Sequence, residues 1–118
     1  MSIERLHKGP RMSQVVIHNN TVYVAGQVAA GASRKNVTEQ TKDILATIDT
    51  LLAEAKTDKG KILSATIWLT DMATFGEMNQ VWDRWVIPGA APARATVVSA
   101  QLAAPEYKIE IAVIAAQA

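Results

Sequence analysis

Segment 36–56 carries its apolar residues at spacings of three and four, which is the period of an amphipathic α-helix. The residues of this stripe are Val37, Thr41, Ile44, Leu45, Ile48, Leu51, Leu52 and Ala55. Asn36 and Glu39 form a capping-box pattern at its start. Lys56 lies close to the expected end, and Gly60 beyond it is a natural stop. The pattern predicts a long helix whose one apolar side must pack on another element.

A second amphipathic helix is predicted after Thr74, where Thr74 and Glu77 repeat the capping-box pattern. Its apolar stripe consists of Phe75, Met78, Val81, Trp82 and Trp85. We interpret this aromatic stripe as core packing, ended by Pro88 and Gly89. Asn79 is a polar residue on this helix, and its residue type alone indicates a solvated position.

Six further segments have the alternation or the β-branched composition of strands. They are residues 3–6, 13–17, 22–26, 62–70, 93–100 and 107–114. Asn19 and Asn20 predict a tight turn between the second and third, because Asn tolerates positive φ. Pro105 belongs in a connection, so we expect the last two strands to form an antiparallel hairpin. The predicted order is β-β-β-α-β-α-β-β, an α+β fold.

Two helices can cover only one face of a sheet of this size. The opposite face is left with Val, Ala, Thr and Ile side chains. A largely apolar, uncovered sheet face is normally an interface. The count of elements therefore predicts an oligomer without fixing its number of subunits.

Arg94 and Glu110 are ionisable residues within otherwise apolar strands. Each charge could lie at a strand end or on a solvent-exposed face, where most strand charges are found. If a charge is buried, it must be paired or used in function, because an unpaired buried charge is costly. Arg94, Thr96 and Val98 share one face of their strand. In a hairpin, Glu110 would lie opposite Val97 or the next residue, roughly 10–13 Å from Arg94. That separation suits a small ligand between the two charges, or two charges that serve different subunits.

Composition sets further bounds on the function. A chain of 118 residues predicts one domain, residues 1–118, and 49% hydrophobic with 19% charged residues indicates a globular protein. The net charge of +1 provides no electrostatic footprint for nucleic acid. No apolar run is long enough for a membrane helix, and the first ten residues lack the core of a signal peptide. We therefore expect a cytoplasmic protein that binds neither membrane nor nucleic acid.

The residues needed for several kinds of catalytic site are scarce. Cysteine is absent, which excludes disulfides, thiolate metal sites and a cysteine nucleophile. His7 and His18 are the only histidines, and they are far apart without a nearby carboxylate pattern. We expect no metal, no cofactor and no Ser-His-Asp triad.

Several motifs together resemble the Rid family, also called YjgF, whose members are enamine/imine deaminases. The motif Pro92-Ala93-Arg94, a short β-rich run, a variable loop and Lys108-Ile109-Glu110-Ile111 carry the resemblance. The triplets at residues 25–27 and 78–80, and the run at 12–15, also fall where family motifs would. The resemblance covers nearly the whole chain. It implies a chorismate-mutase-like fold, a homotrimer and ligand clefts between subunits.

The resemblance also implies roles for individual residues. Arg94 would bind the carboxylate of a small imino acid, such as the tautomer of 2-aminoacrylate, and its planar fork suits bidentate contact. Glu110 would position or activate the attacking water. Gly26 would let backbone groups approach the ligand, and Asn79 would line the cleft.

Three positions depart from the family pattern. The family commonly has Tyr in place of Met12, Ser in place of Ala25 and Cys in place of Thr96, at positions that contact substrate. The loop before Glu110 is also about one residue longer. Carboxylate recognition by Arg94 is retained, while the wall of the pocket is altered.

Two functions remain open at this point. The first is hydrolysis of a 2-imino acid to a 2-keto acid and ammonia. The second is a trimeric, non-catalytic module that binds small carboxylates and regulates a partner. An activity on RNA has been attached to some relatives, and the near-neutral charge argues against it here.

Overall fold

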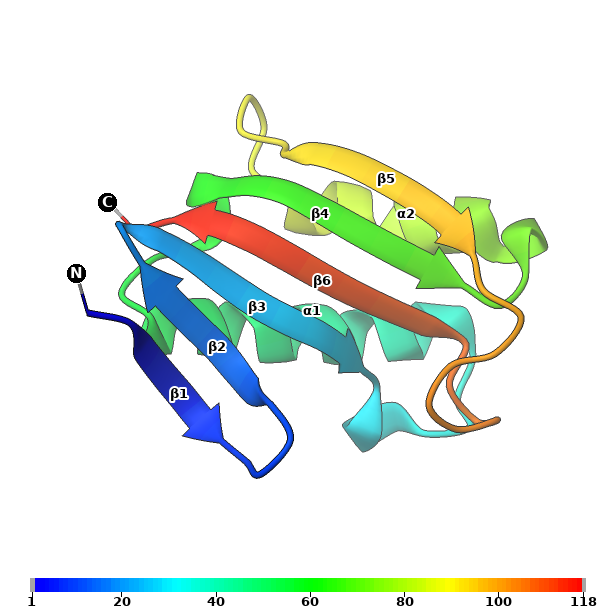
Figure 1. Ribbon diagram of the computed structural model, residues 1–118. Helices are drawn as coiled ribbons and strands as arrows, with labels where there is room; N and C mark the ends of the chain where they lie inside the picture. Colours follow the sequence, from blue (N-terminus) through cyan, green and yellow to red (C-terminus); the bar gives the residue numbers. More distant parts are fainter. Residues whose placement is uncertain (1, 118) are drawn as a thin grey trace.

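One six-stranded mixed sheet organises the protein, seen in a computed structural model that describes residues 2–117. Its strands are β1 (Glu4–Lys8), β2 (Ser13–His18), β3 (Thr21–Val28), β4 (Ile62–Leu69), β5 (Ala93–Val98) and β6 (Ile109–Ala116). The two α-helices are α1 (Val37–Glu54) and α2 (Phe75–Trp85). Both helices lie behind the same face of the sheet (Figure 1). The predicted α+β fold and the predicted order of elements are confirmed.

The strand order across the sheet is β1-β2-β3-β6-β4-β5. The turn between β2 and β3 has positive φ at Asn19 (51°) and Asn20 (60°), as the sequence predicts for a tight hairpin turn. The C-terminal strand β6 lies in the middle, antiparallel to both β3 and β4. The central position of β6 means that Glu110 lies far from either edge of the sheet.

The expected hairpin between the last two strands is wrong. β5 pairs with β4 in parallel, so that Arg94 lies opposite Ala65 and Val97 opposite Trp68. Helix α2 connects these two strands, and such a crossover returns the chain to where it started, which makes parallel pairing possible. Segment 99–108 then carries the chain past β4 to the centre of the sheet (Figure 1). Glu110 consequently pairs with Trp68 and Val28.

The first capping prediction is confirmed: the Asn36 side chain accepts a hydrogen bond from the Glu39 amide at 2.9 Å. Helix α1 ends before Lys56, which adopts the left-handed conformation (φ 63°) that terminates many helices. Gly60 lies beyond this point and does not form the stop. The prediction of a second capping box, at Thr74 and Glu77, is wrong. The Thr74 hydroxyl donates to the Asp71 carbonyl oxygen at 2.7 Å and leaves the start of α2 without a side-chain cap.

Glu77, the other half of that expected box, serves α1 instead. Its carboxylate accepts from the Thr38 amide at 2.9 Å and from the Thr38 hydroxyl at 2.8 Å. The Thr38 amide is one of the free donors in the first turn of α1. Glu77 therefore caps a neighbouring helix, where the positive end of the helix dipole favours a carboxylate.

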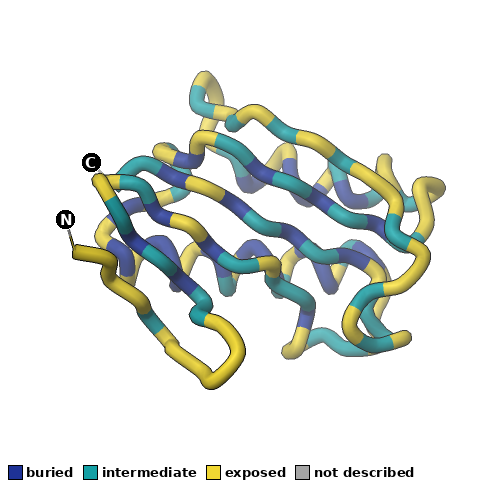
Figure 2. Tube along the Cα trace, in the orientation of Figure 1, coloured by how far each residue is buried: buried dark blue, intermediate teal, exposed yellow. Residues whose placement is uncertain are grey.

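The core lies between the helices and the face of the sheet that they cover. Buried side chains of alternate strand residues meet the buried stripes of both helices; Val15, Val22, Ile67, Ile109 and Ile111 contribute from the strands, and Ile44, Ile48, Leu52 and Met78 from the helices. The opposite face of the sheet, here called the open face, carries no helix (Figures 1 and 2). No helix within residues 2–117 is long and apolar enough to cross a membrane.

The open face exposes several large apolar side chains. Tyr23, Val97 and Ile114 are 43%, 42% and 36% exposed, respectively. The uncovered apolar face predicted from the sequence is therefore present in the chain by itself. A shift in register between Ile62 and Ser64 places Ile62 in the core and leaves Leu63 exposed.

Candidate active site

Arg94 lies on the edge strand β5 with its side chain toward the helices. Its register partner Ala65 is buried on the helix-covered face, and alternation puts Arg94 on that same side. The guanidinium carbon lies 5.3 Å from the centre of the Trp82 ring and 5.7 Å from that of Phe75. One terminal nitrogen, Nη1, lies 3.9 Å from the sulfur of Met78. Helix α2 therefore holds the Arg94 head between two aromatic rings, which favours a cation there.

No carboxylate neutralises this cation within residues 2–117. The ion pairs found there join His7 to Glu54, Lys42 to Glu39 and Lys61 to Asp58. The guanidinium is partly shielded from water yet keeps N–H donors for a further acceptor. An anion such as a carboxylate is the natural partner for that arrangement.

Two polar atoms on the same side of the sheet are buried without a hydrogen-bond partner. They are Oδ1 of Asn79 and Oγ1 of Thr96. Thr96 follows Arg94 by two residues on β5, and Asn79 stands three or four residues from Phe75 and Trp82 on α2, so both belong to the faces around Arg94. An unsatisfied buried polar group costs about 1–3 kcal/mol. Such atoms are suited to receive the polar groups of a ligand.

Glu110 lies in the middle of the sheet and belongs to the open face, because its neighbours Ile109 and Ile111 are buried on the helix side. Burial raises the pKa of the Glu110 carboxyl above its ordinary value. A side chain at Gly26 on β3 would collide with the Glu110 carboxylate. The missing side chain of Gly26 thus makes room for Glu110. The approach of backbone groups to a ligand at Gly26 stays a prediction.

The predicted site residues fall into three groups that one chain does not bring together. Arg94, Asn79 and Thr96 lie on the helix side near the β5 edge. Glu110 and Gly26 lie on the open face, with the half-buried Ala25 beside Gly26 on β3. Met12 is 48% exposed in the turn between β1 and β2, toward the opposite edge of the sheet (Figure 1). Arg94 and Glu110 therefore occupy opposite faces of the same sheet.

Sequence reasoning missed the role of two aromatic residues. Phe75 and Trp82 were assigned to core packing, yet both rings flank the Arg94 guanidinium, and Phe75 is 38% exposed. Their spacing of seven residues, two turns of one helix face, was the available signal. It could not be interpreted before α2 was known to pack beside β5. No group of three His, Cys, Asp or Glu side chains within residues 2–117 is placed to hold a metal ion.

Comparisons with known proteins agree with the motifs around these residues. The sequence model of the family described as Endoribonuclease L-PSP matches residues 3–117. A RutC family protein of Haemophilus influenzae is 47% identical over 115 residues, which cover 98% of each chain. The chain belongs to the Rid/YjgF family. A crystal structure of a YjgF family member from Neisseria meningitidis superposes with a TM-score of 0.95 at 42% identity and covers 100% of this chain and 97% of that one.

A more distant relative of this Rid/YjgF protein has a name that states an activity. The mouse 2-iminobutanoate/2-iminopropanoate deaminase is 32% identical over 110 residues, covering 89% of this chain and 80% of that protein. The more similar bacterial relative is named only for its family. The comparisons thus establish the family and the fold, and the chemistry has to be argued from the site.

Proposed function

We propose that this Rid/YjgF protein hydrolyses 2-imino acids, formed from enamines such as 2-aminoacrylate, to 2-keto acids and ammonia. The observation that carries the proposal is the Arg94 guanidinium, held between Trp82 and Phe75 without a carboxylate partner within residues 2–117. The activity named for the mouse relative supports the same substrate class.

The chemistry requires little from the protein beyond positioning. Arg94 binds the substrate carboxylate and thereby orients the adjacent C=N bond. Glu110 in its ionised form takes a proton from water as the water oxygen bonds to the imine carbon. Glu110 passes this proton to the imine nitrogen, which gives a carbinolamine. It then takes the proton of the new hydroxyl group and delivers it to the nitrogen as the C–N bond breaks, so that a C=O bond forms and ammonia leaves a 2-keto acid. An imine is already electrophilic, so this hydrolysis needs neither a covalent bond to the protein nor a cofactor.

The raised pKa of Glu110 fits the role of a general base. A base works best when its pKa lies closer to the working pH than that of an ordinary carboxylate. Desolvation, which raises this pKa, also makes the ionised carboxylate a stronger acceptor for the proton of water. The missing side chain of Gly26 leaves the space that this carboxylate occupies on the sheet.

A complete site requires two copies of the chain, because Arg94 and Glu110 lie on opposite faces of one sheet. The apolar open face, with Tyr23 and Ile114 exposed, is the surface that a further copy would cover. We propose a homotrimer in which Arg94 of one subunit and Glu110 of another meet across each contact. The cytoplasm remains the predicted location.

The alternative is a non-catalytic module that binds small carboxylates and regulates a partner. The observation that favours it is that Met12 and Ala25 stand where the family commonly has Tyr and Ser, which removes two hydroxyl groups from the pocket wall. RNA cleavage, which the family description names, is not proposed, because a net charge of +1 provides little attraction for phosphates.

Ammonia release from freshly generated 2-iminopropanoate tests the proposal. An amino-acid oxidase would produce the imine from alanine in the assay, and the rate of ammonia and pyruvate formation would be followed with and without the protein. We expect acceleration that is lost in Arg94→Ala. Pyruvate binding by calorimetry without any acceleration would replace the hydrolase with the binding module.

A further inference from the structure

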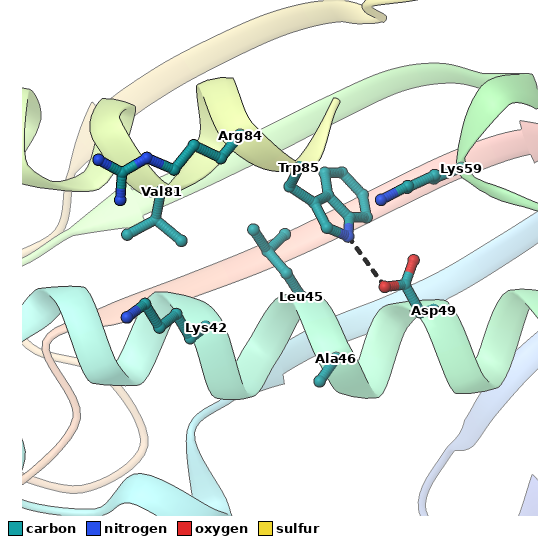
Figure 3. A pocket seen from close by; sticks show the side chains of 8 residues that line it. All are labelled: Lys42, Leu45, Ala46, Asp49, Lys59, Val81, Arg84 and Trp85. Carbon is teal, nitrogen blue, oxygen red and sulfur yellow. Dashed lines mark hydrogen bonds between the residues drawn. The ribbon is translucent and has the colours of Figure 1, made fainter. Parts of the chain in front are cut away.

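A groove runs between α1 and α2 on the outer surface of the helical layer, away from the open face (Figure 3). It encloses about 280 Å³. Leu45 and Val81 line it from the two helices, and Trp85 closes one end. These three side chains are themselves nearly buried, so the groove has an apolar floor that water reaches. Neither Arg94 nor Glu110 contributes to it.

Cations surround this apolar floor. Lys42 and Arg84 extend from the two facing helices, and their charged heads lie toward the same end of the groove (Figure 3). Lys59 lies at the other end, with its ammonium 5.4 Å from the centre of the Trp85 ring. Asp49 is the acidic residue among the lining side chains, so three cations face one carboxylate.

The partners of these charges leave the Arg84 end positive. Asp49 accepts a hydrogen bond from the Trp85 indole nitrogen at 3.0 Å, at the opposite end from Arg84. Lys42 has a loose contact of 3.6 Å with Glu39, and both of these side chains are more than half exposed. Arg84 takes part in none of the ion pairs found within residues 2–117. Its planar fork is therefore free to bind a carboxylate in a bidentate manner.

We infer that this groove binds a small carboxylate that carries an apolar body, such as an aryl or branched alkyl group. The carboxylate would meet Arg84 and Lys42, while the apolar body would cover Leu45 and Val81 and reach the edge of Trp85. The volume lies just below the range of roughly 300–1,000 Å³ typical of drug-sized ligands, which selects a smaller molecule. The site is separate from the proposed deaminase site and does not depend on it. Because it lies on the helix side, a subunit that covers the open face leaves it accessible.

The three tryptophans allow a direct test, and because the Trp82 and Trp85 rings are in contact, with centroids 5.3 Å apart, their signals are compared in the same titration. Trp85 lies in the groove, Trp82 beside Arg94, and Trp68 on the open face. The probe is 3-phenylpropanoate, titrated into nitrogen-15-labelled protein while the indole N–H signals are followed. Each signal is assigned through the matching Trp→Phe variant. We expect the Trp85 signal to shift saturably with the probe.

Two variants and one neutral ligand complete the design. Arg84→Gln should lower the affinity for 3-phenylpropanoate, measured from the Trp85 signal, about tenfold, because a charge-assisted hydrogen bond is lost. Arg94→Gln should leave that response unchanged. The uncharged 3-phenylpropanamide should bind about tenfold more weakly than the acid. A Trp85 signal that stays fixed while that of Trp82 moves, or equal binding of acid and amide, would overturn the inference.

Discussion

The surroundings of Arg94 are hard to explain if its side chain only packs against the fold. A strand-end arginine can simply lay its stem on apolar surface and keep its head in water. Here the head is held by two aromatic rings next to two polar atoms that lack partners. A lysine at this position distinguishes a packing role of Arg94 from carboxylate binding. Lysine keeps the charge and the apolar stem, which are sufficient for packing, but it loses the planar fork that binds a carboxylate in a bidentate manner.

Arg94→Lys should lower the affinity for a 2-keto acid by about tenfold to a hundredfold, the equivalent of one charge-assisted hydrogen bond. Calorimetry with 2-oxobutanoate measures the affinity, and a melting curve measures stability, which should change little. Arg5→Lys, on the exposed strand β1, is the matched control and should change neither. Unchanged binding in Arg94→Lys would return Arg94 to a packing role.

Glu110→Gln should retain keto-acid binding and lose most of the turnover, because the amide has the same shape but cannot take a proton. In the wild type, kcat/KM should fall as the pH drops through the raised pKa of Glu110, at a higher pH than for an ordinary glutamate. A pH–rate profile provides the measurement. An acid limb at the ordinary glutamate pKa, or full activity in Glu110→Gln, would exclude it as the base.

At the scale of elements, one carboxylate of α2 joins the start of α1. Glu77 of α2 caps the first turn of α1 through the amide and hydroxyl of Thr38. Hydrogen bonds from the Thr38 hydroxyl and then from its amide lower the pKa of Glu77. Helix α2 also supplies the Phe75 and Trp82 rings around Arg94.

Glu77→Gln should reduce the free energy of unfolding by about 1–2 kcal/mol at neutral pH, through weaker hydrogen bonds and a lost helix-dipole contact. The lowered pKa means that the contribution of Glu77 is present above the pKa of an unfolded glutamate and disappears as the pH falls through its folded value. Urea unfolding of both proteins at several pH values measures this. Glu39→Gln, in the same first turn of α1, is the control and should change stability less, because the ion pair of Glu39 with Lys42 is exposed. A difference that is independent of pH would contradict the electrostatic explanation.

At the scale of the whole molecule, the sheet separates Glu110, on the open face, from Arg94, on the helix side. The exposed apolar side chains of the open face offer a place for another copy. Assembly would then serve both stability and catalysis. Each function can be tested by a separate experiment.

Ile114→Lys should dissociate the assembly, because it puts a charge on the apolar open face without touching the core. Light scattering across a dilution series reports the mass, and far-UV circular dichroism checks the fold. Ala53→Lys, on the exposed side of α1, introduces the same residue elsewhere and should leave the assembly intact. A wild type that is a monomer at micromolar concentration would end the trimer proposal.

Mixing two inactive variants tests whether the site is shared between copies. Arg94→Ala and Glu110→Ala should each be inactive alone and should recover part of the activity after joint refolding. Mixed assemblies bring an intact Arg94 beside an intact Glu110 at some contacts. No recovery despite proven mixed assembly, shown by native mass spectrometry, would place both residues in the same subunit's site.

The sequence alone determined the features that depend on neighbouring residues. Helical periodicity located α1 and α2, the Asn19-Asn20 pair located the turn of a hairpin, and Asn36 located a cap. Motifs around Arg94 and Glu110 were sufficient for the family. Each of these signals lies within a few residues of the structure that it predicts, where local backbone and side-chain preferences dominate.

Only the tertiary structure decided which distant segments meet. Alternation along β5 and β6 indicated strands, but it did not show that β5 pairs in parallel with β4, since pairing is settled by the crossover through α2. That pairing turns Arg94 toward the helices while Glu110 faces the open side, whereas the two registers considered for a hairpin left open whether the two charges share a face. The same holds for Glu77, whose spacing from Thr74 fits a local cap while its partner Thr38 lies on another helix. Packing of α2 against α1 brings these two residues together, because contacts over such sequence separations depend on the whole fold.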